Sequence, residues 1–427
     1  MSINIAKVYS VLGSKDSIVP LAVKDSFSSL GMTTGSFVTG KEEGYDRFID
    51  EVGTEIVWLG GVPAYKWLFD KTAFKTFGLD YKYDARNLKN KNIFEKTKEY
   101  APDEEIKKAI EKIEKKQGIL KNLTAIKFLL STSLAITSYM MLTKYKQKYT
   151  EKQIKKKLIN EHQLQNNMQQ DEKNFSNNNP TFKSLSSVVE NLAFNSVKNM
   201  WIVDGAITSE RLLASRNPQE FVGYSIKEAF SLCFLYYAGG KIQKMFENNA
   251  IKKHDKNIGL DAKVLENNYI KQVFTDGSIE RSLESFDKIK NEPIQLYDFI
   301  NKNSNNAIVK IAKQADVITS YKNTDKIDTR AYIDLEEIKH IRNNVGELYQ
   351  QYQKATKNGE NSEKFFSKVK KLKRYSIITN IVASIFALGI LAPSIMLIKR
   401  KLFDKDSEFQ TKKDIRAQLI NDGTIKI

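Results

Sequence analysis

The stretch Gly35–Gly44, GSFVTGKEEG, contains the G-x-x-x-x-G-K spacing of a phosphate-binding loop. In that loop the next residue is Ser or Thr, whose hydroxyl binds magnesium. Here it is Glu42, whose carboxylate would repel phosphate. The loop should also follow a buried strand, whereas the preceding residues are polar enough to favour a surface helix. Further acidic residues follow, namely Glu43, Asp46, Asp50 and Glu51. We therefore expect no nucleotide site here.

The same stretch predicts the start of a helix. Thr39 and Glu42 have the S/T-x-x-E spacing of a capping box, in which the two side chains satisfy backbone N–H groups of the first turn. Apolar residues then recur at helical spacing, which predicts an apolar face made of Tyr45, Phe48, Ile49, Val52, Ile56 and Leu59. In the second half of the chain, Ser209 is the equivalent candidate for a helix N-cap.

A polar cluster occupies Ser209–Phe221, SERLLASRNPQEF. Its charged residues, Glu210, Arg211, Arg216 and Glu220, could bind a charged headgroup. Alternatively, Arg–carboxylate pairs position two helices, and Asn217-Pro218 ends one helix and begins the next.

Motifs for catalysis or metal binding are absent from the sequence. Cys233 is the single cysteine, and the histidines, His162, His254 and His340, are too scattered to suggest a zinc site. We find no nucleophile-and-base pair, dinucleotide loop or HExxH motif. We therefore predict no catalytic residues, no metal site, no nucleotide site and no cofactor, and we favour a protein that is not an enzyme.

Two apolar segments are long enough to cross a bilayer. Residues 123–142 carry one charge, Lys127, and residues 375–398 carry none. At about 1.5 Å per residue, each reaches across a hydrocarbon layer of about 30 Å. Pro393 should kink the second segment without preventing it from crossing. The alternative is that both segments are core helices of a large soluble bundle.

Basic residues gather at the ends of these segments, and the chain has a net charge of +17. Lys and Arg at the ends of apolar spans suit anionic lipid headgroups. Nucleic-acid binding is less favoured, because it predicts basic residues interleaved with exposed aromatics on a soluble domain. The flanking residues are Lys144, Lys146, Lys148, Lys152, Lys155, Lys156, Lys157, Lys364, Lys368, Lys370, Lys371, Lys373, Arg374, Lys399, Arg400 and Lys401.

A two-span arrangement divides the chain into regions. We expect residues 145–374 on one side of the membrane, the cytoplasmic side by the positive-inside rule, and both termini on the other. The predicted regions are an N-terminal helical region (1–101), a long helix with the first span (102–159), an amide-rich linker (160–180), a second helical region (181–250), a polar helical insertion (251–362), a basic collar with the second span (363–403) and a C-terminal tail (404–427).

The two halves of the chain share an order of features. Residues from Ser17 align without a gap on residues from Ser187, and each half then reaches an apolar segment with paired glycines. This suggests an internal duplication of residues 17–80 in 181–250. In duplicated membrane proteins, interrupted apolar segments at matching positions often mark a substrate site. The candidate ligand-binding residues are Glu55, Gly60, Gly61, Glu210, Arg211, Arg216, Glu228, Gly239 and Gly240.

The sequence therefore predicts a mainly α-helical membrane protein with two transmembrane helices and helical regions outside the membrane. The favoured function is non-enzymatic engagement of membrane lipids, through their anionic headgroups, or of a protein partner. The alternatives are a duplicated transporter for a small solute or lipid, with its site near the paired glycines, and a membrane-bound lipid-modifying enzyme. The sequence makes no prediction of oligomeric state.

Overall fold

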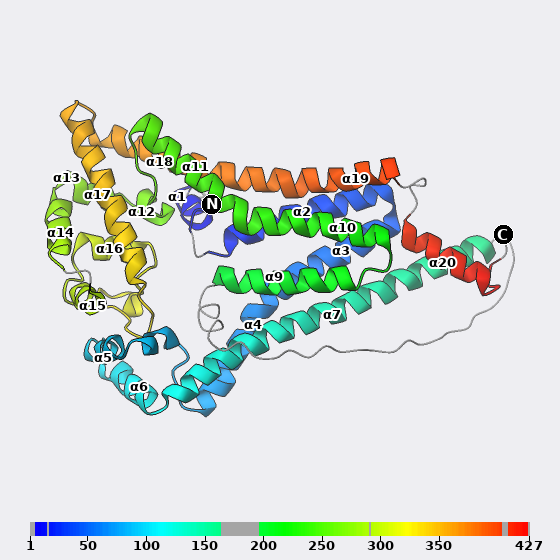
Figure 1. The fold of residues 1–427 in the computed structure, drawn as a ribbon, viewed down its shortest axis with the longest axis horizontal. Helices are drawn as coiled ribbons and strands as arrows, with labels where there is room; N and C mark the ends of the chain where they lie inside the picture. Colours follow the sequence, from blue (N-terminus) through cyan, green and yellow to red (C-terminus); the bar gives the residue numbers. More distant parts are fainter. Residues whose placement is uncertain (1–4, 15–16, 164–195, 290–291, 404–408, 426–427) are drawn as a thin grey trace.

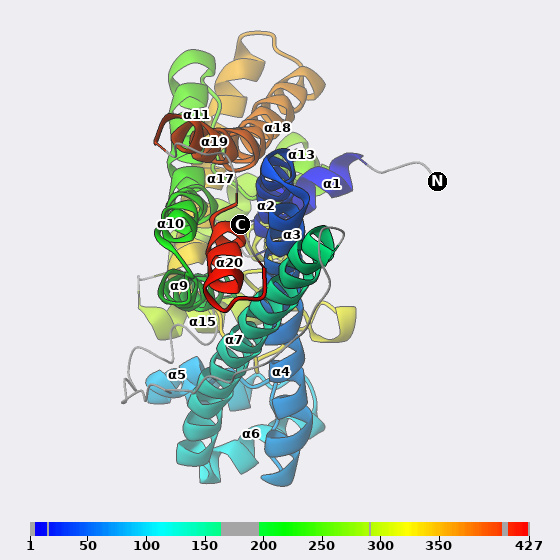
Figure 2. The ribbon, with the colours of Figure 1, turned by 90° about the vertical axis from the view of Figure 1, so that its right-hand side faces the viewer.

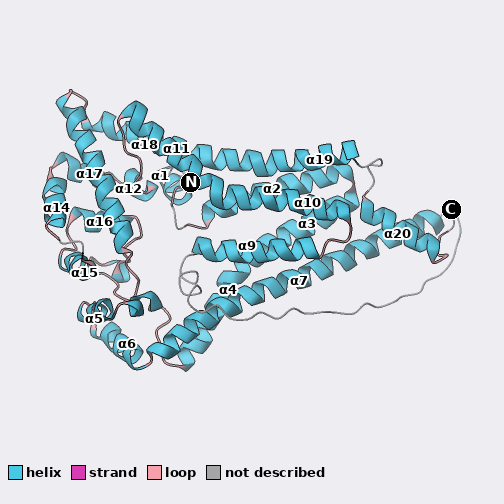
Figure 3. Ribbon diagram, in the orientation of Figure 1, coloured by secondary structure: helices cyan, strands magenta, loops and turns pink. Residues whose placement is uncertain are grey.

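The computed structural model describes residues 5–14, 17–163, 196–289, 292–403 and 409–425 (Figure 1). Most of these residues are helical and no strand occurs among them (Figure 3). The described residues contain one isolated β-bridge, which pairs Ser320 with Ile327. The prediction of a mainly α-helical chain is therefore confirmed.

Long helices lie side by side in a bundle that fills the right-hand part of Figure 1. In three places, consecutive helices continue through a π-helical turn as one rod. Three helices of the bundle stand alone: α2 (Val19–Thr39), α7 (Gln117–Gln163) and α9 (Ser196–Leu213). The first composite rod joins α3 (Lys41–Glu55), η1 (Ile56–Gly61), α4 (Val62–Phe69) and η2 (Asp70–Phe74). The other two join α10 (Pro218–Leu232), η4 (Cys233–Tyr237) and α11 (Ala238–His254), and α18 (Ser362–Phe386), η6 (Ala387–Leu391) and α19 (Ala392–Phe403).

Shorter helices form a second lobe with its own apolar core, on the left of Figure 1. This lobe contains α12 (Ala262–Glu266), α13 (Asn268–Thr275), α14 (Ser278–Asp287), α15 (Pro293–Lys302), α16 (Ala307–Gln314), η5 (Tyr321–Asn323) and α17 (Leu335–Lys357). Residues around η3 (Ala85–Lys89), α5 (Lys91–Glu99) and α6 (Glu104–Lys115) cover the start of α7. Helix α1 (Ile5–Leu12) contacts α12, and α20 (Gln410–Asn421) contacts α7.

Helix α6 has the local signals that its sequence predicts. Asp103 caps it by accepting a hydrogen bond from the Ile106 N–H at 2.9 Å, and Ile106, Ile110 and Ile113, which recur at helical spacing, are buried. The long helix expected over 102–159 is nevertheless two helices. The chain leaves helical geometry at Lys116 (φ −129°, ψ 30°), where α6 ends and α7 begins.

The rods α2 and α18–α19 run in the same direction. Lys24 Nζ donates to Asn380 Oδ1 at 2.9 Å, and farther along both rods Gly31 lies against Gly389. The two contacts therefore occur in the same order along both rods, since Lys24 precedes Gly31 and Asn380 precedes Gly389.

Helix α3 runs against both of its neighbours, α2 and α7. On α7, the Tyr139 hydroxyl donates to Asp50, and Thr150 donates to Asp46, which lies one turn earlier on α3. On α2, Ser29 donates to Glu51. Because α7 and α2 are both antiparallel to α3, the rods α2, α7 and α18–α19 share one direction.

Two helical stretches are long and apolar enough to cross a membrane, Gln117–His162 and Ser362–Leu402. They belong to α7 and to α18–α19, so they run in the same direction. Two such spans cannot leave the whole intervening chain on one side of a bilayer, which differs from the two-span arrangement expected from the sequence. Helix α1 and helix α20 lie at opposite ends of the bundle (Figure 1).

The apolar surface of these rods faces outward. In each candidate span, only 28% of an 18-residue apolar stretch is buried in the structure. Exposed apolar side chains also occur on the other bundle helices. Examples from across the bundle are Phe27, Leu30, Val38, Phe48, Ile56, Trp67, Leu130, Leu134, Met141, Leu213, Tyr237, Ile378, Val382, Phe386, Ile390 and Ile398.

Helix α3 reverses the burial that its periodicity suggests. Tyr45, Phe48 and Ile56 from the predicted apolar face are 58%, 46% and 67% exposed. The opposite face, which carries Asp46 and Asp50, is buried. The periodicity was therefore correctly recognised, but its charged side faces inward.

A helix begins where the Thr39 stretch predicts one, but the predicted capping box does not form; the predicted cap at Ser209 is wrong and the helix start at Asn217-Pro218 is confirmed. Gly40 precedes α3 and provides no side-chain cap, while the Thr39 hydroxyl donates to Ser36 O and Glu43 Oε2 at 2.7 Å each. Ser209 lies inside α9. Asn217 does cap α10, accepting from the Glu220 N–H at 2.9 Å, and Pro218 is its first residue.

Helical structure continues through both glycine pairs. Gly60 and Gly61 end the π-helical turn η1, and Gly239 and Gly240 lie in the first turn of α11, just after η4. The turns η1 and η6 each end shortly before a proline, Pro63 or Pro393. Proline lacks an N–H and its ring crowds the carbonyl four residues earlier, and a π-helical turn accommodates such local disruption.

Glycines allow α2 to approach the rod α18–α19 closely. A Cβ atom on Gly31 would lie 2.1 Å from the carbonyl oxygen of Gly389, and one on Gly35 would lie 3.3 Å from Pro393 Cβ. Gly31 and Gly35 thus form a small-xxx-small motif at a close contact between two helices. Membrane helices use the same pattern to bring their backbones together.

Candidate functional site: a buried ion-pair cluster

Ten charged side chains are buried together in the middle of the bundle, and we call them the ion-pair cluster. They come from α3, α7, α9, α10 and the short connection before α10. Viewed from the end in Figure 2, α2 and α3 lie on one side and α9 and α10 on the other. The cluster comprises Asp46, Arg47, Asp50, Glu51, Lys146, Arg211, Arg216, Glu220, Lys227 and Glu228, none with a side chain more than 12% exposed.

Arg211 of α9 is the centre of the cluster. It forms an ion pair with Glu228, and its Nη2 lies 3.5 Å from Asp50 Oδ2. It also donates from Nε to the Tyr139 hydroxyl at 2.8 Å and from Nη2 to Thr54 Oγ1 at 2.6 Å. One guanidinium therefore connects α3, α7, α9 and α10.

Lys227 extends the cluster toward the N-terminal part of α2. Its Nζ lies 3.4 Å from Glu51 and 3.0 Å from Glu228. It also interacts electrostatically with Asp25 of α2, a buried carboxylate that accepts a hydrogen bond from Trp58 Nε1 at 3.1 Å. The charged interior thus continues beyond the ten residues.

Lys146 of α7 lies among three carboxylates without bonding closely to any. Its Nζ is 3.8 Å from Asp46, 3.7 Å from Asp50 and 3.9 Å from Glu220, and it donates to the Tyr224 hydroxyl at 2.7 Å. Because its ion-pair partners are nearly equidistant, a small shift of the ammonium group can exchange one for another.

Arg216 continues the cluster toward the C-terminal end of α2. Its Nη2 donates to Asp46 at 2.7 Å and to Glu220 at 2.8 Å. Together the cluster holds five carboxylates and five cations, so its formal charge balances. Such balance is necessary because an unpaired buried charge costs several kcal/mol.

Buried polar atoms without a hydrogen-bond partner surround the cluster. Asn199 of α9 is fully buried, and neither atom of its amide is bonded to another described residue. Within the described residues the same holds for Ser28 Oγ, Glu55 Oε1 and Ser231 Oγ. An unbonded buried polar group costs about 1–3 kcal/mol, so these groups lower the stability of the bundle.

One cavity borders the cluster directly, since Asp46, Arg47 and Glu220 line it, whereas none of the ten cluster residues lines the second cavity. The first, the collar cavity, is lined by the C-terminal half of α2, the start of α10 and the basic end of α19, including Gly35, Gly223 and Arg400. The second, the glycine cavity, is lined by the start of α2, the start of α11 and α18, including Lys24 and Gly239. On each of α2, α10–α11 and α18–α19, the residues that line one cavity lie farther along the rod than those that line the other.

Gly239 has a specific role in the glycine cavity. A Cβ atom there would lie 3.0 Å from Asn380 Oδ1 and 3.2 Å from Lys24 Nζ, the two atoms that form the hydrogen bond across the cavity. The glycine therefore leaves room for this polar pair. Gly240 also lines the cavity, whereas no atom lies within 4 Å of a Cβ built on Gly60.

The candidate residues from the sequence thus fall into separate places. Arg211, Arg216 and Glu228 meet in the cluster. Glu210 lies beside it and accepts from Thr143 at 3.2 Å, and Glu55 accepts from Ser26 of α2 at 3.2 Å. The paired glycines of the two halves do not share a cavity, because Gly239 and Gly240 line the glycine cavity while Gly60 and Gly61 do not.

Several cluster residues were missed at the sequence level or assigned to another role. Lys146 and Arg400 were counted among the basic flanks, yet both are buried and turned inward, as is Lys373. Asp46 and Asp50 were used only as acidic residues that argue against a nucleotide site. The signal that could have revealed them is the pattern on α10, where Glu220, Tyr224, Lys227 and Glu228 recur at helical spacing opposite an apolar face.

The fold and the cluster define an all-helical bundle with a charge-paired interior and an apolar exterior. Comparison with known proteins adds no relationship: no family model, no curated protein sequence and no solved structure matches this chain.

Proposed function

We propose that this chain is an integral membrane protein whose bundle carries a small charged solute past the ion-pair cluster. The observation that supports this most is that ten charged side chains are buried in the bundle beside its apolar core, while many large apolar side chains are exposed on its outer surface. Charged residues within a membrane are rare, face a bundle interior and mark solute, ion or proton pathways. The collar cavity and the glycine cavity supply an entry and an exit.

Exchange of ion-pair partners is the proposed mechanism. Arg211, Lys227 and Lys146 each lie within 4 Å of more than one carboxylate. An ion arriving from either cavity replaces one partner, and the displaced side chain then pairs with its next neighbour. The entering ion adds its own charge to the interior, but each displaced side chain keeps an oppositely charged neighbour, which lowers the cost of an unpaired buried charge.

The internal duplication is part of this proposal. Each half contributes a helix, an antiparallel rod with a π-helical turn, and a long apolar rod. In the first half these are α2, α3–α4 and α7, and in the second half they are α9, α10–α11 and α18–α19. In both halves the first helix is bonded to the antiparallel rod that follows it, Ser29 of α2 to Glu51 of α3 and Arg211 of α9 to Glu228 of α10. These two pairs do not align when Ser17 is placed on Ser187. Parallel repeats of this kind occur in transporters.

If the bundle spans a membrane, the segment that connects its two halves carries an energetic cost. Residues 164–195, outside the described residues, join the end of α7 to the start of α9, which lie at opposite ends of the bundle. Roughly thirty extended residues can reach about 100 Å, but polar backbone does not face lipid. This gives a topology that can be tested.

In a membrane, the N-terminus and the second lobe should share one side. Cysteines introduced at Lys7 and at Asn303, each in a Cys233→Ala background, should react with an impermeant maleimide from the same side, and a cysteine at Asp422 from the other. All three positions are exposed. The two-span hairpin instead places Lys7 and Asn303 on opposite sides, so labelling from opposite sides would contradict the proposed topology.

The native Cys233 tests the membrane placement itself. Its side chain is exposed, and Ser384, in the middle of the second apolar segment, donates to the adjacent Phe234 O at 3.4 Å. In intact membranes, lipid should shield Cys233 from a charged maleimide until detergent is added, whereas a cysteine at Asn303 should react throughout. Rapid labelling of Cys233 in membranes would contradict membrane embedding, as would release of the protein by alkaline carbonate.

Transport is tested in proteoliposomes with gradients of H⁺, Na⁺, K⁺ or Cl⁻ as separate probes. We expect the protein to dissipate at least one gradient, and Glu51→Gln to reduce that flux strongly, because Glu51 is a partner of both Lys227 and Arg211. Glu105→Gln, an exposed change on α6, is the matched control. Absence of flux with all four probes, or equal flux in Glu51→Gln, would contradict the transport proposal.

A further inference from the structure

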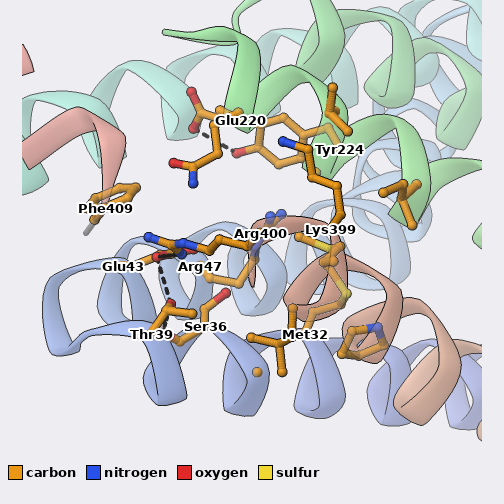
Figure 4. Close-up of a pocket in the computed structure, with 18 of the residues that line it drawn as sticks. Met32, Ser36, Thr39, Glu43, Arg47, Glu220, Tyr224, Lys399, Arg400 and Phe409 are labelled. Atoms are coloured by element: carbon orange, nitrogen blue, oxygen red, sulfur yellow. Dashed lines mark hydrogen bonds and ion pairs between the residues drawn. The ribbon is translucent and has the colours of Figure 1, made fainter. Parts of the chain in front are cut away.

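We infer that the collar cavity binds an anionic amphiphile, a molecule with one phosphate or carboxylate group and an apolar chain. This inference rests on the proposed membrane placement but not on transport. Figure 4 shows Arg400 and Arg47 projecting into the space between α2, α10 and α19, with Glu43 beside them. The cavity contains about 750 Å³ of empty space, part of it open to solvent.

Arg400 is built into the cavity wall. Its side chain is 8% exposed, and its Nη1 donates to Glu43, whose other contact is the Thr39 hydroxyl. Arg400 Nε and Nη2 have no hydrogen-bond partner among the described residues. Two adjacent guanidinium N–H groups on one edge match two oxygens of a phosphate or carboxylate.

The acidic residues of the cavity are already paired, and one of them, Glu43, is paired with Arg400 through Nη1 and leaves the other edge of the guanidinium unbonded by any other described residue. Asp46 and Glu220 both accept from Arg216, and Glu43 is held by Arg400. Arg47, whose guanidinium lies 4.7 Å from the centre of the Tyr224 ring, also lines the cavity but is paired with Glu51. Nε and Nη2 of Arg400 are therefore the donors proposed to meet a ligand.

An apolar wall adjoins the charged one. It is formed by Met32, Val222, Ile226, Pro393, Met396 and Leu397. Gly223 keeps this wall open, since a Cβ atom there would lie 3.1 Å from Met396 Cε. Because Arg400 follows the second apolar segment directly, its guanidinium lies at the depth where lipid headgroups meet acyl chains. A bilayer phospholipid is thus one source of the ligand, and a free fatty acid is the other.

Native mass spectrometry of the full-length protein in non-ionic detergent tests the inference. The probes are dioleoyl phosphatidylglycerol, dioleoyl phosphatidylcholine, oleate and inorganic phosphate. We expect one saturable phosphatidylglycerol or oleate per chain, weaker retention of phosphatidylcholine, and about tenfold weaker binding in Arg400→Gln, as for loss of a hydrogen bond to a charged group. Lys401→Gln, the exposed neighbour on α19, should bind as the parent does.

Each outcome decides the inference. Retention of phosphatidylglycerol but not oleate supports a phospholipid as the source, and the reverse supports a free fatty acid. Equal retention of phosphatidylcholine, unchanged binding in Arg400→Gln, or displacement by inorganic phosphate alone would overturn the amphiphile site. If Arg400→Gln fails to fold, Gly223→Leu tests the same cavity without a charge change and should also weaken binding. Carbonate extraction and Cys233 shielding report on membrane placement separately.

Discussion

Replacing Arg211 with glutamine should destabilise the bundle by about 3–5 kcal/mol, the usual cost of breaking a buried ion pair from one side. The change leaves Glu228 and Asp50 with less positive charge nearby and removes the bonds to Tyr139 and Thr54. Because these partners come from α3, α7 and α10, four helices lose their shared contact together. A large fall in thermal unfolding temperature, measured in detergent, is the expected result.

The matched control is Arg281→Gln on α14, which removes the same charge from an exposed position. It should change the unfolding temperature little, because exposed substitutions usually alter stability by less than about 0.5 kcal/mol. A stable Arg211→Gln protein with an unfolding temperature close to that of Arg281→Gln would show that the cluster does not hold the bundle together.

Replacing Gly31 with alanine should separate α2 from the rod α18–α19. The added Cβ atom would lie 2.1 Å from the carbonyl oxygen of Gly389 and 2.6 Å from its Cα, so backbone has to move. Overpacking of this kind costs about 1–3 kcal/mol. We expect a lower unfolding temperature and, if the membrane proposal holds, a weaker association of the two helices in a crosslinking assay between α2 and α18–α19.

The control is Gly60→Ala in η1, where nothing lies within 4 Å of the new Cβ atom. Since glycine inside a helix is less favourable than alanine by about 0.5–1 kcal/mol, this change should be neutral or stabilising. The two glycine substitutions are thus expected to differ in sign. A Gly31→Ala protein as stable as Gly60→Ala would contradict the close packing of α2 on Gly389.

Local signals in the sequence predicted local structure well. Asp103 before α6 and Asn217-Pro218 before α10 are caps whose effect depends on a few neighbouring backbone groups, and both lie at helix starts. The capping box at Thr39 was wrong because its hydroxyl has another partner, Glu43, one turn away. A helix start can be inferred from nearby residues only where no stronger contact competes.

The candidate site could be predicted only in part. Arg211, Arg216 and Glu228 were among the candidate ligand-binding residues, but Asp46 and Asp50 were used only as an argument against a nucleotide site, and Lys146 was counted in a basic flank. Their pairing depends on Thr150 of α7 lying beside Asp46 of α3 and on Tyr224 of α10 lying beside Lys146. Contacts between residues this far apart in the chain leave no signal in the spacing of either helix.

The sequence by itself determined that the chain is helical, that two segments are apolar enough to cross a membrane, and where the periodic faces of the helices lie. Only the tertiary structure decided which face is inside. On α3 the apolar face of Phe48 and Ile56 is outside and the charged face of Asp50 is buried. Periodicity separates two faces, but the choice between them depends on what each face meets. Here, carboxylates meet the cations of three other helices, and the apolar side chains are left on the outer surface.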